Sequence, residues 1–348
     1  MSRIPHLEWS STQSSILTAD NSALSHWKRV PFTKEELPHH HLASGTSRGA
    51  FESFAEEQPR GHPVVGAWSR TLFTGAYSHT TDADETCFNL QALGWFIDFR
   101  LPLSKPAFRA NSLSELSPEE LRAYARQHIF GGYTRVELNT GSLPVATRHH
   151  VIDWNYLRDS RPIPNKWRVR MQRNNNVWRE VAFAKDEEGE PYYWEKWERM
   201  LGDGGGGEYA AFRRRGDFDG IIVCVGGYFN YLFPRRGGAL SDMEGSPVSV
   251  VDKLVEAGDL EGARAVLSIR GGHGVIVDGN WVVKRSISPW EEGRTFLSSN
   301  DVALEASGAR ECKIKGEVWD IVEESRPGYV ESLFGGAVKG RHWQQSNL

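Results

Sequence analysis

Short apolar runs separated by clusters of turn-forming residues recur along most of this sequence, and no other feature constrains its fold as strongly. From residue 62 onward, runs of Val, Ile, Phe, Tyr and Trp alternate with Gly, Pro, Asn and Asp clusters. Runs of strand length bounded by turn signals are typical of all-β sandwiches and barrels. The sequence therefore predicts a mainly β fold with few helices.

The predicted strands form two series. The first covers residues 64–73, 87–101, 134–138, 147–155, 167–172, 177–183 and 192–201, and the second covers 210–214, 220–233, 265–270, 273–287 and 312–323. Between them, residues 202–207 read Gly-Asp-Gly-Gly-Gly-Gly, so we expect a linker or a mobile hairpin loop there. Within the second series, Asp278-Gly279 between two apolar runs predicts a tight hairpin.

This arrangement divides the chain into three parts. Residues 1–55, rich in Ser, Thr, His and Pro, are predicted to form an N-terminal arm, residues 56–203 a first β-rich unit, and residues 208–348 a second β-rich unit with a C-terminal tail. Short helices are predicted for 117–128, 249–257 and 260–265. The first of these has Ser117 placed as its N-cap and Pro118 in its first turn.

The composition argues against several classes of protein. A formal net charge of −4 makes nucleic acid an unexpected partner. No run approaches the about 20 apolar residues of a membrane helix, and the first residues lack a signal-peptide run, so we expect neither a membrane protein nor a secreted one. The three cysteines, at 87, 224 and 312, are too few and too far apart for a disulfide framework, which favours the reducing cytoplasm.

Cofactor motifs are missing from the sequence. It has no Walker loop, no G-x-S-x-G elbow and no H-E-x-x-H motif. The histidines at 39–41 have no carboxylate partner beside them, so a functional metal site is not expected there. We therefore expect a protein that works without a cofactor or a metal.

Thirteen tryptophans stand out in the composition. Large rings bury about 150–250 Å² each, and they line sites for flat or apolar ligands. The pattern therefore favours a barrel cavity lined with aromatic side chains, although each Trp can equally fill a β core.

Segment 87–101 places a charge pair among aromatic residues. If it is one strand, its alternation puts Asp98 and Arg100 on one face. The same face then carries the apolar side chains of Phe88, Leu90 and Phe96. One hypothesis is that Asp98 holds Arg100 in a cavity, where the guanidinium donates to a ligand carbonyl or oxyanion. The alternative is a structural ion pair near the barrel rim.

Segment 148–154 contains two histidines in a predicted strand. Alternation groups His149 with Asp153, and it places His150 with Trp154 on the other face. Either histidine could act as an acid or base near neutral pH. The alternative is a hydrogen-bonded or solvated ring without a chemical role.

Segment 192–199 alternates rings with charges. Tyr193, Glu195 and Trp197 share one face, which would make an aromatic wall with one acid. The alternative is an ordinary cross-strand ladder.

These segments supply two groups of candidate site residues. The candidate catalytic residues are Asp98, Arg100, His149 and Glu195. The candidate substrate-binding residues are Trp95, Phe96, Trp154, Tyr193 and Trp197.

The same segments, at 85–102, 149–154 and 193–199, resemble a family of mostly uncharacterised bacterial and fungal proteins. The stretch 218–228, FDGIIVCVGGY, and the stretch 316–322, GEVWDIV, are similar to the yeast Hri protein. This resemblance implies a pair of lipocalin-like, or calycin-like, antiparallel β-barrels. The chain also resembles the fungal hetero-Diels–Alderases of tropolonic sesquiterpenoid biosynthesis, which implies a reaction class but no residue roles.

Three functions fit these observations. The first is a cofactor-independent pericyclase of fungal secondary metabolism, which joins an electron-poor quinone-methide-type diene to an apolar terpene alkene. The second is a non-catalytic lipocalin-like carrier or sensor of an apolar metabolite. The third is an interaction protein whose second barrel is filled by its own side chains. The expected partners are an apolar or aromatic small molecule and a second copy of the chain in a homodimer.

Overall fold

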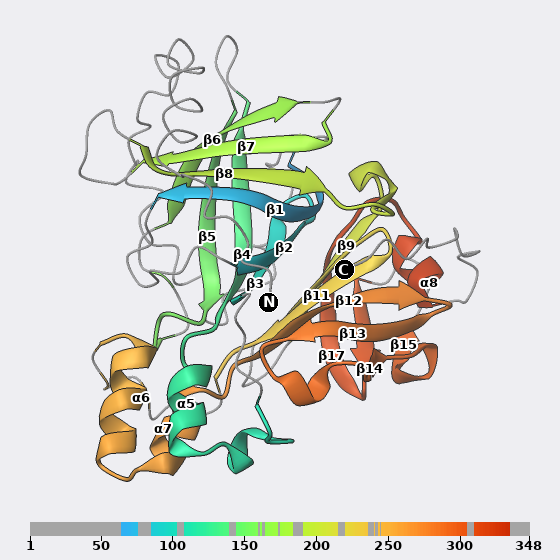
Figure 1. Cartoon of the computed structure of the whole chain (residues 1–348). Coiled ribbons are helices and arrows are strands. Elements are labelled where there is room, and N and C mark those ends of the chain that lie inside the picture. Colours follow the sequence, from blue (N-terminus) through green and yellow to red (C-terminus); the bar gives the residue numbers. More distant parts are fainter. Residues whose placement is uncertain are drawn as a thin grey trace, which may run out of the picture.

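The computed structural model of the protein describes residues 64–75, 85–102, 108–138, 144–158, 161, 164–172, 175–183, 191–214, 220–235, 240, 243, 245–304 and 310–334. In this part of the chain the fold is mainly β, as predicted, with two antiparallel barrel-like sheets and a few short helices (Figure 1). The predicted arm, 1–55, and the last residues of the predicted tail, 335–348, lie outside the described residues. The division into domains stays a prediction.

The first sheet closes into an eight-stranded barrel, because β1 pairs with β8 as well as with β2. Neighbouring strands are antiparallel throughout. As in any β-strand, their side chains alternate between the barrel interior and its outer face. The strands are β1 (Gly66–Gly75), β2 (Glu85–Gln91), β3 (Trp95–Pro102), β4 (His128–Glu137), β5 (Val145–Asp153), β6 (Asn165–Gln172), β7 (Val177–Phe183) and β8 (Pro191–Arg199).

The second sheet has nine strands in the order β14-β13-β12-β11-β10-β9-β17-β16-β15. Its two edge strands, β14 and β15, have three residues each. The strands are β9 (Tyr209–Arg214), β10 (Ile221–Val225), β11 (Tyr228–Phe233), β12 (Arg270–Val277), β13 (Asn280–Ser286), β14 (Thr295–Leu297), β15 (Val302–Leu304), β16 (Glu311–Ile314) and β17 (Glu317–Glu324).

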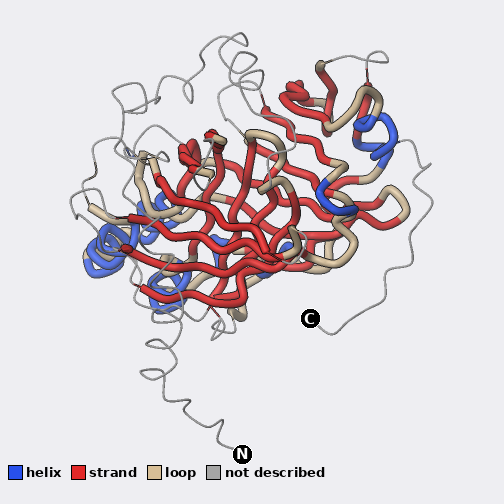
Figure 2. Tube along the Cα trace, turned by 90° about the horizontal axis from the view of Figure 1, so that it is seen from above, coloured by secondary structure: helices blue, strands red, loops and turns tan. Residues whose placement is uncertain are grey.

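The helices lie at the periphery of the strands (Figure 2). They are α5 (Pro118–Tyr124), α6 (Pro247–Glu256), α7 (Leu260–Val266) and α8 (Tyr329–Phe334). Helix α5 begins with the capping box of Ser117 and Glu120, so its predicted start is confirmed, but it ends well before residue 128 because β4 begins there. Among the described residues, no helix has the length and apolarity needed to span a membrane.

Several predicted strands differ from the observed ones: two of them are hairpins, and one begins later in the chain. Segment 87–101 is two strands, β2 and β3, because the chain turns at 92–94 and Gln91 Nε2 donates to carbonyl oxygens of that turn. Segment 220–233 likewise divides into β10 and β11. Residues 265–266 end α7 instead of beginning a strand. The predicted Asp278-Gly279 hairpin is confirmed, and both residues have the positive φ of a type I′ turn, 50° and 74°.

The outer face of the barrel packs against the second sheet. Trp95, Ile97 and Phe99 of β3 share one apolar cluster with Val223 of β10 and Leu232 of β11. A Cβ atom at Gly131 of β4 would lie only 3.0 Å from Leu232 Cδ2, so a side chain there would push the two sheets apart. Close packing of the sheets therefore depends on a glycine in β4.

Asn230 of β11 crosses this interface. Its side-chain amide donates to the carbonyl oxygens of Phe88 at 3.2 Å and Ile97 at 2.9 Å. Its oxygen lies 2.8 Å from His273 Nδ1, and burial lowers the pKa of His273 to about 3, so the neutral ring donates to Asn230. Both polar atoms of the buried Asn230 side chain are thus hydrogen-bonded.

Glu323 of β17 makes a second link. Its carboxyl oxygens accept hydrogen bonds from the amide of Gly94, in the turn between β2 and β3, at 2.8 Å and from the amide of Trp95, the first residue of β3, at 3.3 Å. Burial raises the pKa of Glu323 to about 7, although the amide donors lower it. The interface therefore contains a carboxyl group that titrates near neutral pH.

The glycine-rich segment joins β8 to β9, as predicted, and contains the short 3-10 helix Gly204–Gly206. The buried Asp203 accepts from the amide of Ala67 at 3.3 Å and from the amide of Gly205 at 2.8 Å, and it pairs with Arg199 at 2.5 Å. Gly204 and Gly205 have positive φ values of 69° and 76°. The glycines therefore allow a tight turn around one buried carboxylate.

We expect the Glu323→Gln variant to show less dependence of stability on pH than the wild type. The folded-state pKa of Glu323 lies above its unfolded value. The stability that its carboxyl group contributes to the folded protein is therefore fully present below about pH 4.5 and is lost as the pH rises through about 7. Between about pH 5 and about pH 8, the free energy of unfolding of the wild type should fall by up to about 3 kcal/mol relative to the variant. Urea denaturation of both proteins measures this difference. The exposed Glu256→Gln is the control, and parallel pH profiles for all three proteins would contradict the prediction.

Candidate functional site

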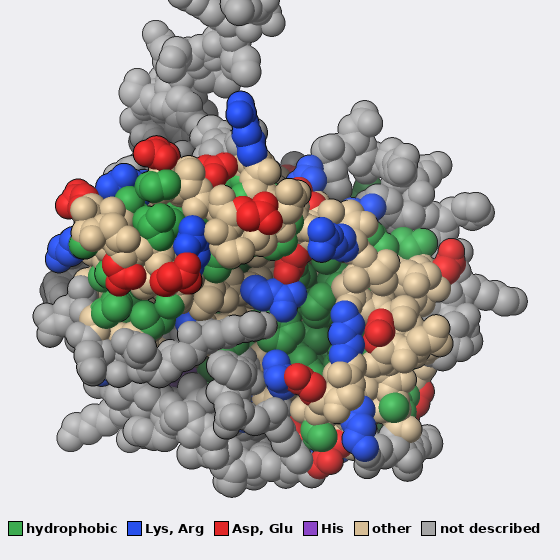
Figure 3. Space-filling model, turned by 90° about the horizontal axis from the view of Figure 1, so that it is seen from below, with side chains coloured by type: hydrophobic (Ala, Val, Ile, Leu, Met, Phe, Trp, Pro, Cys, Tyr) green, Lys and Arg blue, Asp and Glu red, His purple; other side chains and the backbone are tan. Residues whose placement is uncertain are grey.

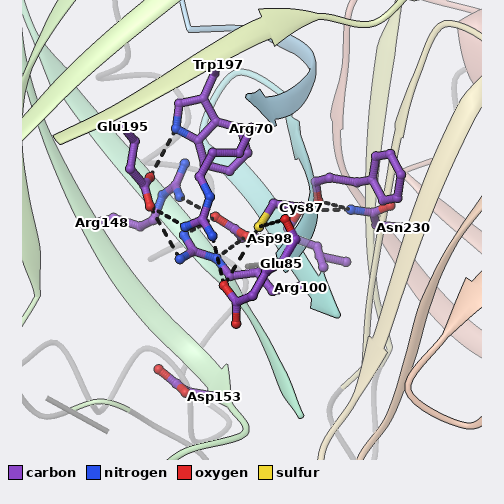
Figure 4. Close-up of polar contacts among 12 residues, drawn as sticks. Arg70, Glu85, Cys87, Asp98, Arg100, Arg148, Asp153, Glu195, Trp197 and Asn230 are labelled. Atoms are coloured by element: carbon purple, nitrogen blue, oxygen red, sulfur yellow. Dashed lines mark hydrogen bonds and ion pairs between the residues drawn. The ribbon is translucent and has the colours of Figure 1, made fainter. Parts of the chain in front are cut away.

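A network of buried ion pairs occupies the interior of the first barrel. Arg100 pairs with Asp98 through two hydrogen bonds, at 2.8 and 2.9 Å, and reaches Glu195 Oε1 at 3.4 Å. Arg70 lies 2.6 Å from the same Glu195 oxygen and 2.8 Å from Glu85. The side chains come from β1, β2, β3 and β8 and point toward one another across the barrel (Figure 4).

The carboxyl groups of this network are not equivalent. Burial raises the pKa of Glu85, although Arg100 and Arg70 lower it. Burial, and then the neighbouring charge of Glu195, raises the pKa of Glu180 well above its ordinary value. Burial and the charge of Glu195 thus both favour the protonated form of the Glu180 carboxyl group.

Indole rings fill the space beside the charges. Trp178 lies 5.6 Å from Trp68, 5.7 Å from Trp197 and 6.5 Å from Trp167 between ring centroids. Each of these rings is at most 2% exposed. Beside the ion network, the barrel interior is thus occupied by the protein's own indole rings.

The guanidinium groups lie over aromatic rings. Arg148 lies 4.0 Å from the ring centroid of Phe96 and 4.7 Å from that of Trp167, and it reaches Asp98 at 3.5 Å. Trp197 donates its indole proton to Glu195 at 3.1 Å. Phe96 and Trp197, predicted to bind substrate, thus pack onto the ion network.

The structure brings five of the nine predicted site residues together, separates three from them, and leaves the side chain of Tyr193 undescribed. Asp98, Arg100, Glu195, Phe96 and Trp197 meet in the barrel interior. Trp95 points the other way, toward the second sheet, and Trp154 lies beside α5, where its indole donates to Ala125 O at 3.0 Å. His149 stacks on Tyr133 at 4.7 Å, on the outer face of the barrel. Tyr193 lies in β8, but its side chain is outside the described ones.

A histidine–aspartate pair replaces the grouping predicted for β5. His150 Nδ1 lies 2.6 Å from Asp153 Oδ2, and the His150 ring stacks on Phe130 at 4.2 Å between centroids. The register of β4 and β5 shifts between Gly131 and Gly132, which is a β-bulge. Because a bulge inserts one residue, it reverses the alternation and pairs Asp153 with His150, not with His149.

The second sheet encloses a cavity of about 610 Å³ that sequence reasoning missed. Tyr231, Phe233, Phe296 and Trp319 supply its rings. Tyr231 stacks on Phe296 at 4.3 Å, and Phe233 meets Trp319 edge to face at 5.9 Å. Seen from below, the molecule has a hollow with a hydrophobic floor and with Lys and Arg side chains along its edge (Figure 3).

A chain of polar contacts runs along one side of this cavity. Tyr231 donates its phenolic proton to Glu291 at 2.5 Å, and Glu291 pairs with Arg270 at 2.6 Å. Burial raises the pKa of Tyr231 well above its usual value, and the Glu291 charge raises it further. The cavity therefore combines an aromatic wall with a neutral phenol and a paired guanidinium.

The described residues offer no group of three or more His, Cys, Asp or Glu side chains arranged to hold a metal ion. Cys87 and Cys224 are fully buried, and burial raises the pKa of each thiol well above its usual value. Both sulfur atoms are therefore protonated, and they are poor nucleophiles.

We expect the Arg100→Ala variant to be destabilised by about 3–5 kcal/mol, because the change leaves two carboxylates buried with less compensating charge. Arg122→Ala is a suitable control, since Arg122 pairs with Asp252 at 3.5 Å but is 34% exposed. This control should cost about 1 kcal/mol or less. Urea denaturation measures both free energies, and an Arg100→Ala variant as stable as its control would indicate an open ligand site instead of a structural network.

Comparison with known proteins gives one structural neighbour. No family model and no curated protein matches this chain. The solved structure of an uncharacterized protein from Saccharomyces cerevisiae is similar to it, with 12% sequence identity and a TM-score of 0.44. The match covers 74% of this chain and 98% of the yeast chain. The expected similarity to a yeast protein is met to this extent, and the relation to the hetero-Diels–Alderases stays a prediction.

Proposed function

We propose that this protein is a non-catalytic carrier or sensor, which binds an apolar small molecule in the cavity of the nine-stranded sheet. The observation that carries the proposal is the cavity itself. Its volume of about 610 Å³ falls in the range of small-molecule sites, about 300–1,000 Å³. Its rings offer the flat apolar contact area that such a ligand needs.

The site predicted in the first barrel is less suited to this role. Arg100, its proposed hydrogen-bond donor, is engaged by Asp98 and Glu195 and lies 5.1 Å from the Phe130 ring centroid. A ligand carbonyl would have to break buried ion pairs to reach that guanidinium, which costs more than one hydrogen bond returns. We therefore place the ligand in the second sheet.

The second candidate is the cofactor-independent cyclase. The observation that favours it is Arg270, which borders the same aromatic cavity and lies 5.6 Å from the Phe233 ring centroid. A diene carbonyl that accepts from a guanidinium becomes more electrophilic, and holding diene and alkene together removes the cost of their encounter. Both new bonds of the cycloaddition come from the π electrons of the two reactants, so no proton or redox partner is required.

We expect the uncharged fluorescent amine N-phenyl-naphthylamine to bind the wild type with a stoichiometry of one in native mass spectrometry. Phe233→Ala and Phe296→Ala should each weaken binding about two- to tenfold in a fluorescence titration, because each removes one ring of the wall. Phe108→Ala is the matched control, since Phe108 is a half-buried ring that packs on Tyr124 away from the cavity. Absence of binding, or an equal loss in all three variants, would refute the proposed function.

Incubation with a tropolone quinone-methide precursor and humulene separates the two candidates. A carrier or sensor should leave the yield of adduct at the level of the protein-free reaction, measured by liquid chromatography and mass spectrometry. An adduct yield that rises with protein concentration and falls in Arg270→Gln would support the cyclase instead.

A further inference from the structure

We infer that the ligand of the second-sheet cavity carries one anionic group, held at the cavity mouth by Arg294 and Lys315. This inference rests on the proposed binding function, and it names the chemical class of the ligand. The compounds meant are apolar molecules with a carboxylate, sulfonate or phosphate at one end.

The charge around the cavity is opposite in sign to that of the whole chain. The chain has a formal net charge of −4. The cavity, in contrast, is lined by four cationic side chains, those of Arg214, Arg270, Arg294 and Lys315, and by two anionic ones, those of Glu291 and Glu317. A cleft with an excess of one sign concentrates ligands of the other sign.

Both acids are already paired within the lining. Glu317 forms an ion pair with Arg214, and Glu291 forms one with Arg270 at 2.6 Å while accepting the Tyr231 hydroxyl proton. These pairs neutralise two of the four cations. The excess charge therefore belongs to the two remaining residues.

Arg294 and Lys315 form no ion pair within the part of the chain that the structure describes, and both are exposed. Asp301 lies near enough for Lys315 to lower its pKa, but the larger cause is hydrogen bonding of its carboxylate to Ser298, at 2.7 and 2.8 Å. Two cations at the mouth thus stay available to a ligand anion.

The two cations come from near opposite edges of the nine-stranded sheet. Arg294 immediately precedes the edge strand β14, and Lys315 immediately follows β16, which is next to the other edge strand. The Lys315 ammonium nevertheless lies 5.8 Å from the ring centroid of Phe296 in β14, so the sheet curls until its two ends approach each other. Phe296 and Lys315 therefore place an aromatic surface and a cation side by side at the entrance.

This arrangement fits an amphipathic ligand in one orientation. Its apolar body can lie against Phe233, Phe296 and Trp319, where burial supplies most of the affinity. Its anion can then receive charge-assisted hydrogen bonds from Arg294 and Lys315 while it stays close to water. Because exposed ion pairs contribute modestly, the two cations should set selectivity more than total affinity.

Two dyes with the same carbon skeleton test this inference. Anilinonaphthalene sulfonate carries a sulfonate that N-phenyl-naphthylamine lacks, and both are followed by fluorescence titration of the full chain. We expect the sulfonate to bind the wild type more tightly than the neutral dye. Arg294→Gln and Lys315→Gln should each weaken sulfonate binding about threefold, and the double variant about tenfold, with the affinity for the neutral dye unchanged.

Lys284→Gln is the matched control, because Lys284 is an exposed lysine of β13 that does not line the cavity. It should leave the affinities for both dyes unchanged. Raising the salt concentration from about 0.05 M to about 0.5 M should reduce the preference for the sulfonate, since exposed charges are screened.

The outcomes distinguish the two proposals. If neither dye binds, the proposed function fails. If the neutral dye binds and depends on Phe233 and Phe296, but the sulfonate is not preferred or its affinity is unchanged in the double variant, the proposed function stands and the inference of an anionic ligand is overturned. Equal loss of sulfonate binding in Lys284→Gln would also overturn it, because the attraction would then be non-specific.

Discussion

The contact between the outer face of the barrel and the second sheet is the interaction on which the rest of the structure depends. Apolar side chains of β2, β3 and β4 supply its area, and Gly131 lets the sheets approach. Apolar packing has no preferred direction, so it cannot by itself fix how one sheet lies on the other. Asn230 and Glu323 make the packing directional, because each forms hydrogen bonds with particular backbone groups of β2, β3 or the turn between them. Leaving either partner unmatched would cost the desolvation of a buried polar group.

The mainly β fold could be predicted from the sequence because each strand carries its own signal, an apolar run ended by turn residues. The pair of barrels was implied only by the resemblance to a double-barrel family. The same local alternation placed Asp98 and Arg100 on one face, where they form an ion pair, but it gave no reason to expect Glu195 of β8 beside them. It failed where the chain departs from a period of two. The turn at 92–94 moved Phe88 to the face opposite Asp98, and the bulge in β5 paired Asp153 with His150. Neither departure has a Gly-Pro or Asn-Gly signal in the sequence.

The second-sheet cavity could not be predicted by the same means. Tyr231, Phe296 and Lys315 are far apart in the sequence, and they meet because the nine strands curl, which no local pattern encodes. Arg294 and Lys315 lie just outside strands, where strand alternation does not predict which way a side chain points. The charged residues of the first barrel, in contrast, could be identified from the sequence, because ionised side chains are rare within aromatic strand segments. In the structure they form a buried ion network.

The first sheet is closed and the second is not, which explains why side chains fill the interior of the first whereas the second contains a cavity. The first closes through the β1–β8 ladder, so its interior is sealed from the side and its charges must satisfy one another. The second ends at β14 and β15, three-residue strands that are too short to continue the ladder. Helix α8 covers part of the inner face of this unclosed sheet, and the rest opens at the cavity, where exposed cations such as Arg294 keep their hydration at little cost. A ligand with an apolar body and an anionic end, as proposed above, would cover the apolar lining of that opening while leaving the cations solvated, which a purely apolar filling could not do.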